Sequence, residues 1–228
     1  MQQDDKLKEA LNQYKKENFH IRNLSEYEVE LKSLVRKVVK YIKDNNLNVD
    51  AVIPILRGGN VPATFLAYAL DVLLIIPVQY KYFFIDKKVC ELRRIISFNT
   101  NLIKKKKPVF LLVEGNHCYG NQAKHAASDL KDLYPNSKII YAASNMDYNH
   151  QTAVKDASAV FYGRLTNDCK ELSKKECIKL KINCDKDLFF PWENIEEEWE
   201  IVELKQHKYN NLQDIYRNSS LVETFNLS

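Results

Sequence analysis

The sequence lacks an apolar run long enough to cross a membrane, which takes about 18 residues or more. The longest apolar stretch, residues 69–78, contains Asp71 and Pro77 and is better explained as a buried strand with its approach. The N-terminal segment is charged throughout and has no apolar centre of the kind that a signal peptide needs. We therefore expect a cytoplasmic protein without a membrane partner.

Cysteine spacings typical of metal or disulfide frameworks are also absent. The five cysteines are an odd number without a CxxC motif, which favours reduced thiols. Cys169, Cys177 and Cys184 are not accompanied by a nearby pair of histidines, so their spacing predicts no zinc site. A strong charge of one sign is missing too: 34 basic and 30 acidic residues give a net charge of +4, which does not indicate nucleic acid as a main partner.

What the chain does contain is an alternation of short apolar runs and helical patterns. Runs with β-branched residues indicate buried strands, and segments with apolar residues three and four apart indicate helices. This alternation predicts an α/β protein with a parallel sheet that helices cover on both faces. The expected strands are 49–55, 73–80, 108–113, 137–144 and 157–163, and the expected helices are 25–45, 61–70 and 121–134.

Two loops follow expected strands and are candidates for ligand binding, since ligands of open α/β sheets lie beyond the carboxyl ends of the strands. In "LRGGN", Gly58 and Gly59 let backbone amides approach an anion, and Arg57 adds a charged fork. The same two glycines also fit a simple tight turn. In "LLVEGNHCYGNQAKHAASDL", a strand runs through a short turn into an alanine-rich helix, the layout of a phosphate-binding loop without the usual Ser or Thr.

These stretches resemble, in order and spacing, the type I phosphoribosyltransferases, and the purine-salvage branch is the most similar. The resemblance rests on "VDAVIPILRGGNVPATFLAYAL", "PVFLLVEGNHCYGNQAKHAASDLKDLYPNSKIIYAAS" and "FFPWE", and it extends from residue 25 to residue 193. It implies transfer of 5-phosphoribose from phosphoribosyl pyrophosphate to a purine-type base, with Mg²⁺ on the pyrophosphate. It also implies a hood hairpin at about 81–107 and a homodimer or larger assembly.

The resemblance assigns roles to individual residues. It implies a pyrophosphate loop with a cis peptide near Leu56, and it makes Glu114 the carboxylate for the ribose and a Mg²⁺ ion. His117 is a candidate catalytic base, although a loop histidine is more often exposed or caps a helix. The implied pyrophosphate residues are Arg57, Gly58 and Gly59; the 5-phosphate loop is Cys118, Tyr119, Gly120, Asn121 and Gln122; the base-binding residues are Asn145, Phe161, Tyr162 and Trp192.

Four positions depart from the family pattern. Gly115 stands where the second carboxylate is expected, Cys118 where some members carry an acidic base, Tyr119 where a hydroxyl precedes the glycine, and Gln122 where the final Thr is expected. Each lost hydrogen bond to a charged phosphate is worth about 1.5–3 kcal/mol. Backbone amides at the start of the following helix remain available to an anion.

Three hypotheses remain open from the sequence. The chain is an active phosphoribosyltransferase with an atypical 5-phosphate loop, a catalytically inactive regulator that binds a nucleotide or a phosphoribosyl compound, or an interaction protein that keeps only the architecture. The expected domain boundaries are an N-terminal helical extension at 1–24, a phosphoribosyltransferase-like domain at 25–200, and a C-terminal tail at 201–228 that is a candidate docking segment for a protein partner.

Overall fold

The computed structural model describes residues 19–86, 89–182 and 187–192. Most of the N-terminal helical extension expected at 1–24 and the whole tail at 201–228 lie outside these ranges. The chain divides into two compact units, one formed by residues 25–184 and the other by residues 1–24 with 185–228. Among the described residues, no helix is both long and apolar enough to cross a membrane.

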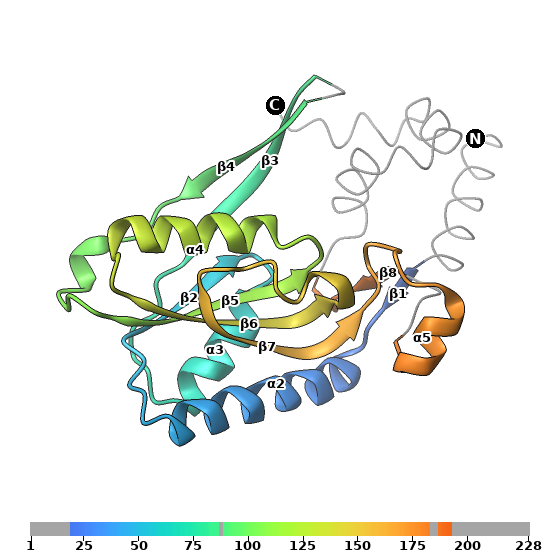
Figure 1. The fold of residues 1–228 in the computed structure, drawn as a ribbon, viewed down its shortest axis with the longest axis horizontal. Helices are drawn as coiled ribbons and strands as arrows, with labels where there is room; N and C mark the ends of the chain where they lie inside the picture. Colours follow the sequence, from blue (N-terminus) through green and yellow to red (C-terminus); the bar gives the residue numbers. More distant parts are fainter. Residues whose placement is uncertain (1–18, 87–88, 183–186, 193–228) are drawn as a thin grey trace, which may run out of the picture. The chain divides into compact units, whose positions relative to one another are not determined.

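The larger unit contains a mixed sheet with the strand order β4-β3-β2-β5-β6-β7 (Figure 1). All neighbouring pairs are parallel except β3 and β4, which form an antiparallel hairpin. The α/β prediction and the hairpin are therefore confirmed. The strands are β2 (Ala51–Leu56), β3 (Val78–Asp86), β4 (Val89–Ile96), β5 (Val109–His117), β6 (Lys138–Asp147) and β7 (Ala157–Thr166).

Helices cover both faces of this sheet, so the central strands β2, β5 and β6 are buried on both sides (Figure 1). On one face α4 (Asn121–Leu133) contacts the sheet through small residues, which let its backbone approach closely. On the other face lie α2 (Leu24–Asp44) and α3 (Asn60–Ala69). The remaining elements are the short helices η1 (Thr100–Leu102), η2 (Tyr148–His150) and α5 (Lys174–Leu180).

The smaller unit is described by a pair of short strands. β1 (Phe19–Ile21) runs parallel to β8 (Asp187–Phe189). The Arg22 guanidinium lies 4.2 Å from the ring centroid of Phe190, and the ring of Trp192 stacks on Phe190 at 5.1 Å. The "FFPWE" stretch is thus partly built into this pair of strands by aromatic and cation–π contacts.

Several strand boundaries differ from the sequence-based expectation. The second strand begins at Val78, because Ile75 forms only an isolated bridge with Val52. β5 extends beyond its apolar run to His117, because Asn116 and His117 continue to pair with β6. This extension shortens the expected phosphate loop to the residues at 118–120.

Candidate functional site

The carboxyl ends of β2, β5, β6 and β7 lie at one edge of the sheet, because these strands are parallel to one another. Each is followed by a loop that carries polar groups: residues 57–59, 118–120, 148–150 and 167–173. This is the edge at which open α/β sheets bind ligands. Each predicted site residue in the larger unit can therefore be located relative to this edge.

The loop after β2 has the shape that the sequence resemblance implied. The Leu56–Arg57 peptide bond is cis. The Gly59 amide donates to the Ile55 carbonyl at 2.9 Å, so it is committed within the turn. Arg57 is exposed at the edge of the sheet. Of the predicted pyrophosphate residues, Arg57 is thus the one whose charged side chain faces solvent.

Gly115, at the position where a second carboxylate is expected, packs directly against the backbone of Gly58. A Cβ atom at Gly115 would lie 2.7 Å from the Gly58 carbonyl carbon and 2.8 Å from its oxygen. Such distances are shorter than side-chain carbons tolerate, so a side chain at 115 requires the 57–59 loop to move. The packing of the 57–59 loop against β5 therefore requires a glycine at position 115.

Gly115→Asp is expected to lower the free energy of unfolding by about 2–3 kcal/mol, the usual cost of forcing atoms into a packed site. Asn116→Asp is the matched control, because Asn116 is exposed and surface changes usually stay within about 0.5 kcal/mol. Urea denaturation of both variants measures the difference. Equal stability of the two variants would show that the 57–59 loop adapts freely.

Glu114 lies inside the protein and already has a partner. Glu114 is a residue of β5 and is 6% exposed. Its Oε2 atom accepts a hydrogen bond from the Tyr141 hydroxyl. Burial, together with the nearby Glu114 carboxylate, raises the pKa of Tyr141 well above its ordinary value, so the hydroxyl keeps its proton. A Mg²⁺ ion prefers an octahedral set of oxygens, and this single committed carboxylate does not fit such a set.

His117 is buried as well, with 1% exposure, so the sequence-based view of it as an exposed loop residue is wrong. Nδ1 lies 2.8 Å from the Tyr141 hydroxyl oxygen, and Nε2 lies 3.0 Å from the His150 carbonyl oxygen. Both ring nitrogens are therefore engaged internally.

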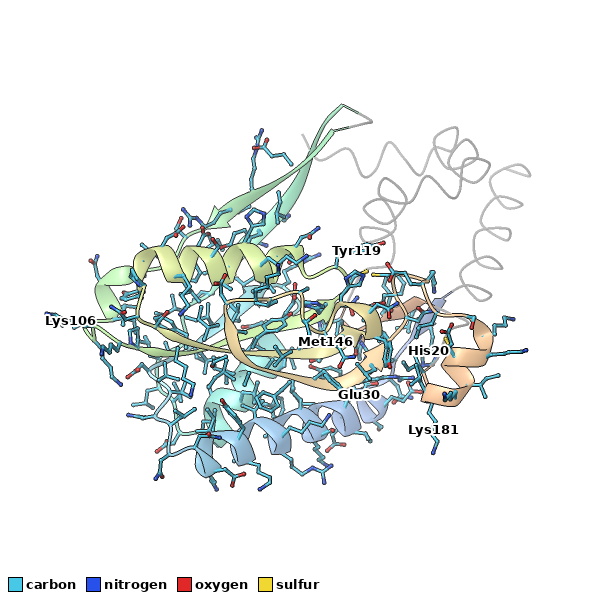
Figure 2. The ribbon with its side chains drawn as sticks, viewed as in Figure 1. His20, Glu30, Lys106, Tyr119, Met146 and Lys181 are labelled. Carbon is cyan, nitrogen blue, oxygen red and sulfur yellow. The ribbon has the colours of Figure 1, made fainter. Side chains whose placement is uncertain are left out.

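The turn before α4 packs on His117. Gly120 has φ 67°, and a Cβ there would lie 2.2 Å from the His117 Cε1 atom. Tyr119 is half-exposed, and its ring packs edge-on against the His150 ring with the two centroids 5.0 Å apart. Figure 2 labels Tyr119 near the N-terminal end of α4. Tyr119 thus does not fold under the helix. Asn121 begins α4, and the Gln122 amide donates to the Tyr80 carbonyl at 3.3 Å.

Three of the four residues predicted to bind a base belong to the larger unit, where they have other contacts. Asn145 is fully buried on β6. The ring of Phe161 packs against Tyr41 on α2 at 5.1 Å, and the Lys37 ammonium lies 4.5 Å from the centroid of Tyr162. Trp192 belongs to the smaller unit. In the larger unit these contacts are those of core and helix-packing residues.

The hood strands have arginines with local partners. Arg94 on β4 lies 2.7 Å from Asp129 on α4, which also accepts a hydrogen bond from Tyr80 at 2.6 Å. Arg93 pairs with Glu91 on its own strand. Burial, followed by the bond to Asp129, raises the pKa of Tyr80. Both arginines are thus held on the hairpin and on α4 rather than directed at the 118–120 turn.

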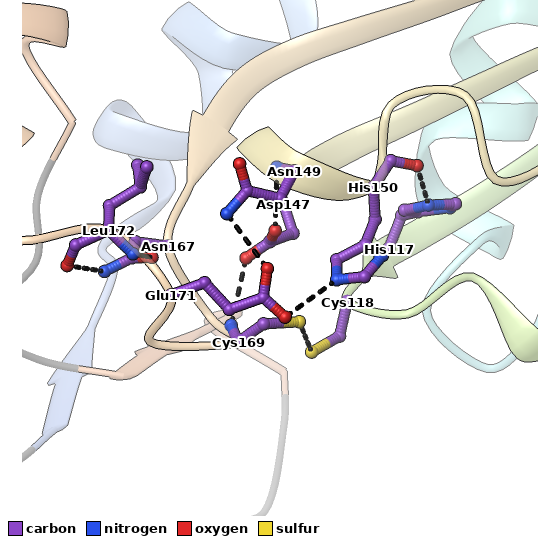
Figure 3. A network of polar contacts seen from close by, with 9 residues as sticks. All are labelled: His117, Cys118, Asp147, Asn149, His150, Asn167, Cys169, Glu171 and Leu172. Atoms are coloured by element: carbon purple, nitrogen blue, oxygen red, sulfur yellow. Dashed lines mark hydrogen bonds and ion pairs between the residues drawn. The ribbon is translucent and has the colours of Figure 1, made fainter. Parts of the chain in front are cut away.

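Sequence reasoning missed one cluster at this edge, shown in Figure 3. Asp147, His150 and Cys169 place one ligand-type atom each within 4.8 Å of one another, and Cys118 Sγ lies 3.0 Å from Cys169 Sγ. Hydrogen bonding to Cys118 and burial raise the pKa of Cys169. Cys118 and Cys169 are free thiols, whereas Cys177 is disulfide-bonded, so the expectation of reduced cysteines is wrong for Cys177.

No model of a protein family matches the sequence, and no curated protein sequence matches it. Solved structures do match its fold. A purine phosphoribosyltransferase from Pyrococcus horikoshii is 16% identical with a TM-score of 0.54, over 78% of this chain and 95% of that one. The Helicobacter pylori xanthine-guanine-hypoxanthine phosphoribosyltransferase is 15% identical with a TM-score of 0.51, over 81% and 99%.

The chain has the type I phosphoribosyltransferase fold. A hypothetical protein from Neisseria gonorrhoeae with bound ppGpp is similar too, with 13% identity and a TM-score of 0.56, over 84% of this chain and 98% of that one. At these identities the similarity concerns the phosphoribosyltransferase fold, and the chemistry has to be argued from the residues.

Proposed function

We propose that this protein binds a phosphorylated nucleotide or phosphoribosyl compound at the carboxyl edge of its sheet and does not transfer phosphoribose. It would then be the inactive regulator among the sequence-based hypotheses. The observation that carries the proposal is the state of Glu114, whose carboxylate is buried and accepts a bond from Tyr141. A transferase of this fold needs a carboxylate that faces the ribose and the metal, as the family resemblance implies.

Two features support retained anion binding. Arg57 presents a guanidinium at the edge of the sheet, and a guanidinium matches phosphate oxygens with two parallel bonds. The start of α4 follows Gly120 and has no side-chain cap, so its first amides point outward from the helix end. The similar protein from Neisseria gonorrhoeae holds ppGpp, a ligand with two diphosphate groups that suits such donors.

Isothermal titration calorimetry tests the binding claim. The intact protein is expected to bind ppGpp or phosphoribosyl pyrophosphate saturably. Arg57→Ala is expected to weaken that binding about 10- to 100-fold, because hydrogen bonds to charged groups contribute about 1.5–3 kcal/mol. Arg36→Ala is the matched control, since Arg36 is an exposed arginine on α2, and it should leave the affinity unchanged.

A pyrophosphate-release assay tests the claim of inactivity. Phosphoribosyl pyrophosphate, Mg²⁺ and a panel of purine bases should yield no pyrophosphate above a protein-free control. Release that Glu114→Ala abolishes would establish the active transferase instead. Absence of binding by either ligand, with a folded protein, would leave the interaction protein as the remaining hypothesis.

A further inference from the structure

Three loops that follow neighbouring parallel strands bring sulfur, nitrogen and oxygen donors together. Cys118 follows β5, and Cys169 follows β7. Asp147 is the last residue of β6, and His150 lies in the loop that follows it (Figure 3). We propose that Cys118, Cys169, His150 and Asp147 form a zinc-binding site at this edge of the sheet. Nothing in the phosphoribosyltransferase resemblance implies this site, and its argument does not depend on the ligand proposed above.

Three of the four donors already lie near one another, and the Cys118 thiol adjoins one of them. The donor atoms of Asp147, His150 and Cys169 are all within 4.8 Å of one another. The two sulfur atoms are 3.0 Å apart, whereas zinc–sulfur bonds of about 2.3 Å in a tetrahedron place two sulfurs about 3.8 Å apart. Rotation of either thiol away from the other opens the space that the ion occupies.

The kind of donors selects the kind of metal. Two thiolates and an imidazole are soft or borderline ligands, which favour zinc over the hard ions Mg²⁺ and Ca²⁺. Cys, His and Asp all serve as zinc ligands in tetrahedral sites. The set of Cys118, Cys169, His150 and Asp147 supplies four such ligands, so it closes the tetrahedron without a water molecule.

Neighbouring groups already hold these donors in place. The Asp147 carboxylate accepts the Asn149 amide at 3.0 Å and the Cys169 amide at 2.9 Å, one on each oxygen. Glu171 Oε1 lies 3.4 Å from His150 Nε2 (Figure 3). Such supporting contacts orient metal ligands, and their loss typically weakens metal binding about 10- to 100-fold. The carboxylate of Asp147 keeps lone pairs for an ion, because each oxygen accepts one backbone bond.

A metal ion here ties the turn before α4 to the loops after β6 and β7. Cys118 precedes His150 by 32 residues, and His150 precedes Cys169 by 19, so the ion would link segments that otherwise meet mainly through β5–β6 and β6–β7 pairing. The ion would then fix the shape of the turn at 118–120 that leads into α4. We infer that the ion has a structural role.

Metal uptake by the full-length chain tests the proposal. The protein, purified anaerobically and treated with a chelator that is then removed, is incubated with Zn²⁺ and analysed by mass spectrometry for metal. About one tightly bound zinc per chain is expected, as for a four-ligand structural site. Substitution with Co²⁺ is expected to give thiolate-to-cobalt charge-transfer bands, which report sulfur ligation directly.

Variants assign the site. Cys169→Ser and His150→Ala are expected to weaken zinc binding about a hundredfold or more, since loss of an outer contact alone costs about 10- to 100-fold. His125→Ala is the matched control, because His125 is exposed on α4, and it should bind zinc like the wild type. Circular dichroism identifies a variant that fails to fold.

Differential alkylation of the wild-type chain needs no variant. Zinc is expected to protect Cys118 and Cys169 from iodoacetamide, with peptide mass spectrometry locating the label, while alkylation elsewhere stays the same. Absence of zinc uptake by the wild type overturns the proposal. It is also overturned by uptake that leaves both cysteines reactive, or by a Cys118–Cys169 disulfide in the anaerobically purified protein.

Discussion

Gly59→Ala is expected to lower the free energy of unfolding by about 3 kcal/mol or more, at the upper end of what overpacking costs. A Cβ at this position would lie 2.3 Å from the Val113 carbonyl oxygen and 2.7 Å from that of Ile55. Both are backbone atoms of the central strands β2 and β5, which cannot rotate away as a side chain does. Urea denaturation followed by circular dichroism measures the loss.

The backbone conformation of Gly59 shows that crowding of the added Cβ, and not backbone strain, causes the expected loss of stability. Its φ of −71° and ψ of −12° are right-handed helical values that alanine adopts readily. Gly58→Ala is the matched control in the same loop, because its Cβ would lie 3.3 Å from the Gly115 Cα and 3.7 Å from the Gly115 nitrogen, without a closer contact. We expect that variant to lose less than about 1 kcal/mol, as a small adjustment of the loop suffices. Comparable losses in the two variants would mean that close packing on β5 is not the cause.

The fold was largely predictable because its signals are local. Buried parallel strands appear as short apolar runs, and the helical period of α2 and α4 is visible in the sequence. The strand ends were less predictable, since the pairing of His117 with Met146 on β6 is a contact between distant segments. The short strands β1 and β8 gave no pattern of their own for the same reason, because each has three residues and is defined by its partner.

The site was predictable only in outline. "LRGG" and the residues from Glu114 to Gly120 indicated the edge of the sheet at which the loops after the parallel strands meet. The sequence could not show that Glu114 turns toward Tyr141, since that depends on which face of β5 each residue takes once the strand is extended. Nor could it group Cys118 with Cys169, because metal and thiol patterns in sequence rely on close spacing.

Tyr141→Phe is expected to destabilise the protein by about 2–3 kcal/mol, because a hydrogen bond to a charged group contributes about 1.5–3 kcal/mol and the buried acceptor loses its donor. Tyr141 is fully buried, donates to Glu114 and lies 2.8 Å from His117 Nδ1. Without the hydroxyl, the Glu114 carboxylate and the His117 ring, 3.6 Å apart, lose the group that bridges them. Tyr134→Phe is the matched control, because the Tyr134 hydroxyl donates a long bond of 3.3 Å to the Ile103 carbonyl in a partly buried position. That variant should lose about 1 kcal/mol or less.

The double variant Tyr141→Phe with Glu114→Gln separates a structural role of Glu114 from a catalytic one. Glu114→Gln removes the charge of the carboxylate that has lost its Tyr141 donor. The double variant should therefore be more stable than Tyr141→Phe alone, with a coupling free energy of about 1–3 kcal/mol in denaturation experiments. Glu114→Gln by itself should bind ppGpp or phosphoribosyl pyrophosphate with unchanged affinity. Additive stabilities together with lost ligand binding would place the Glu114 carboxylate at the ligand, and the inactive regulator would have to be abandoned.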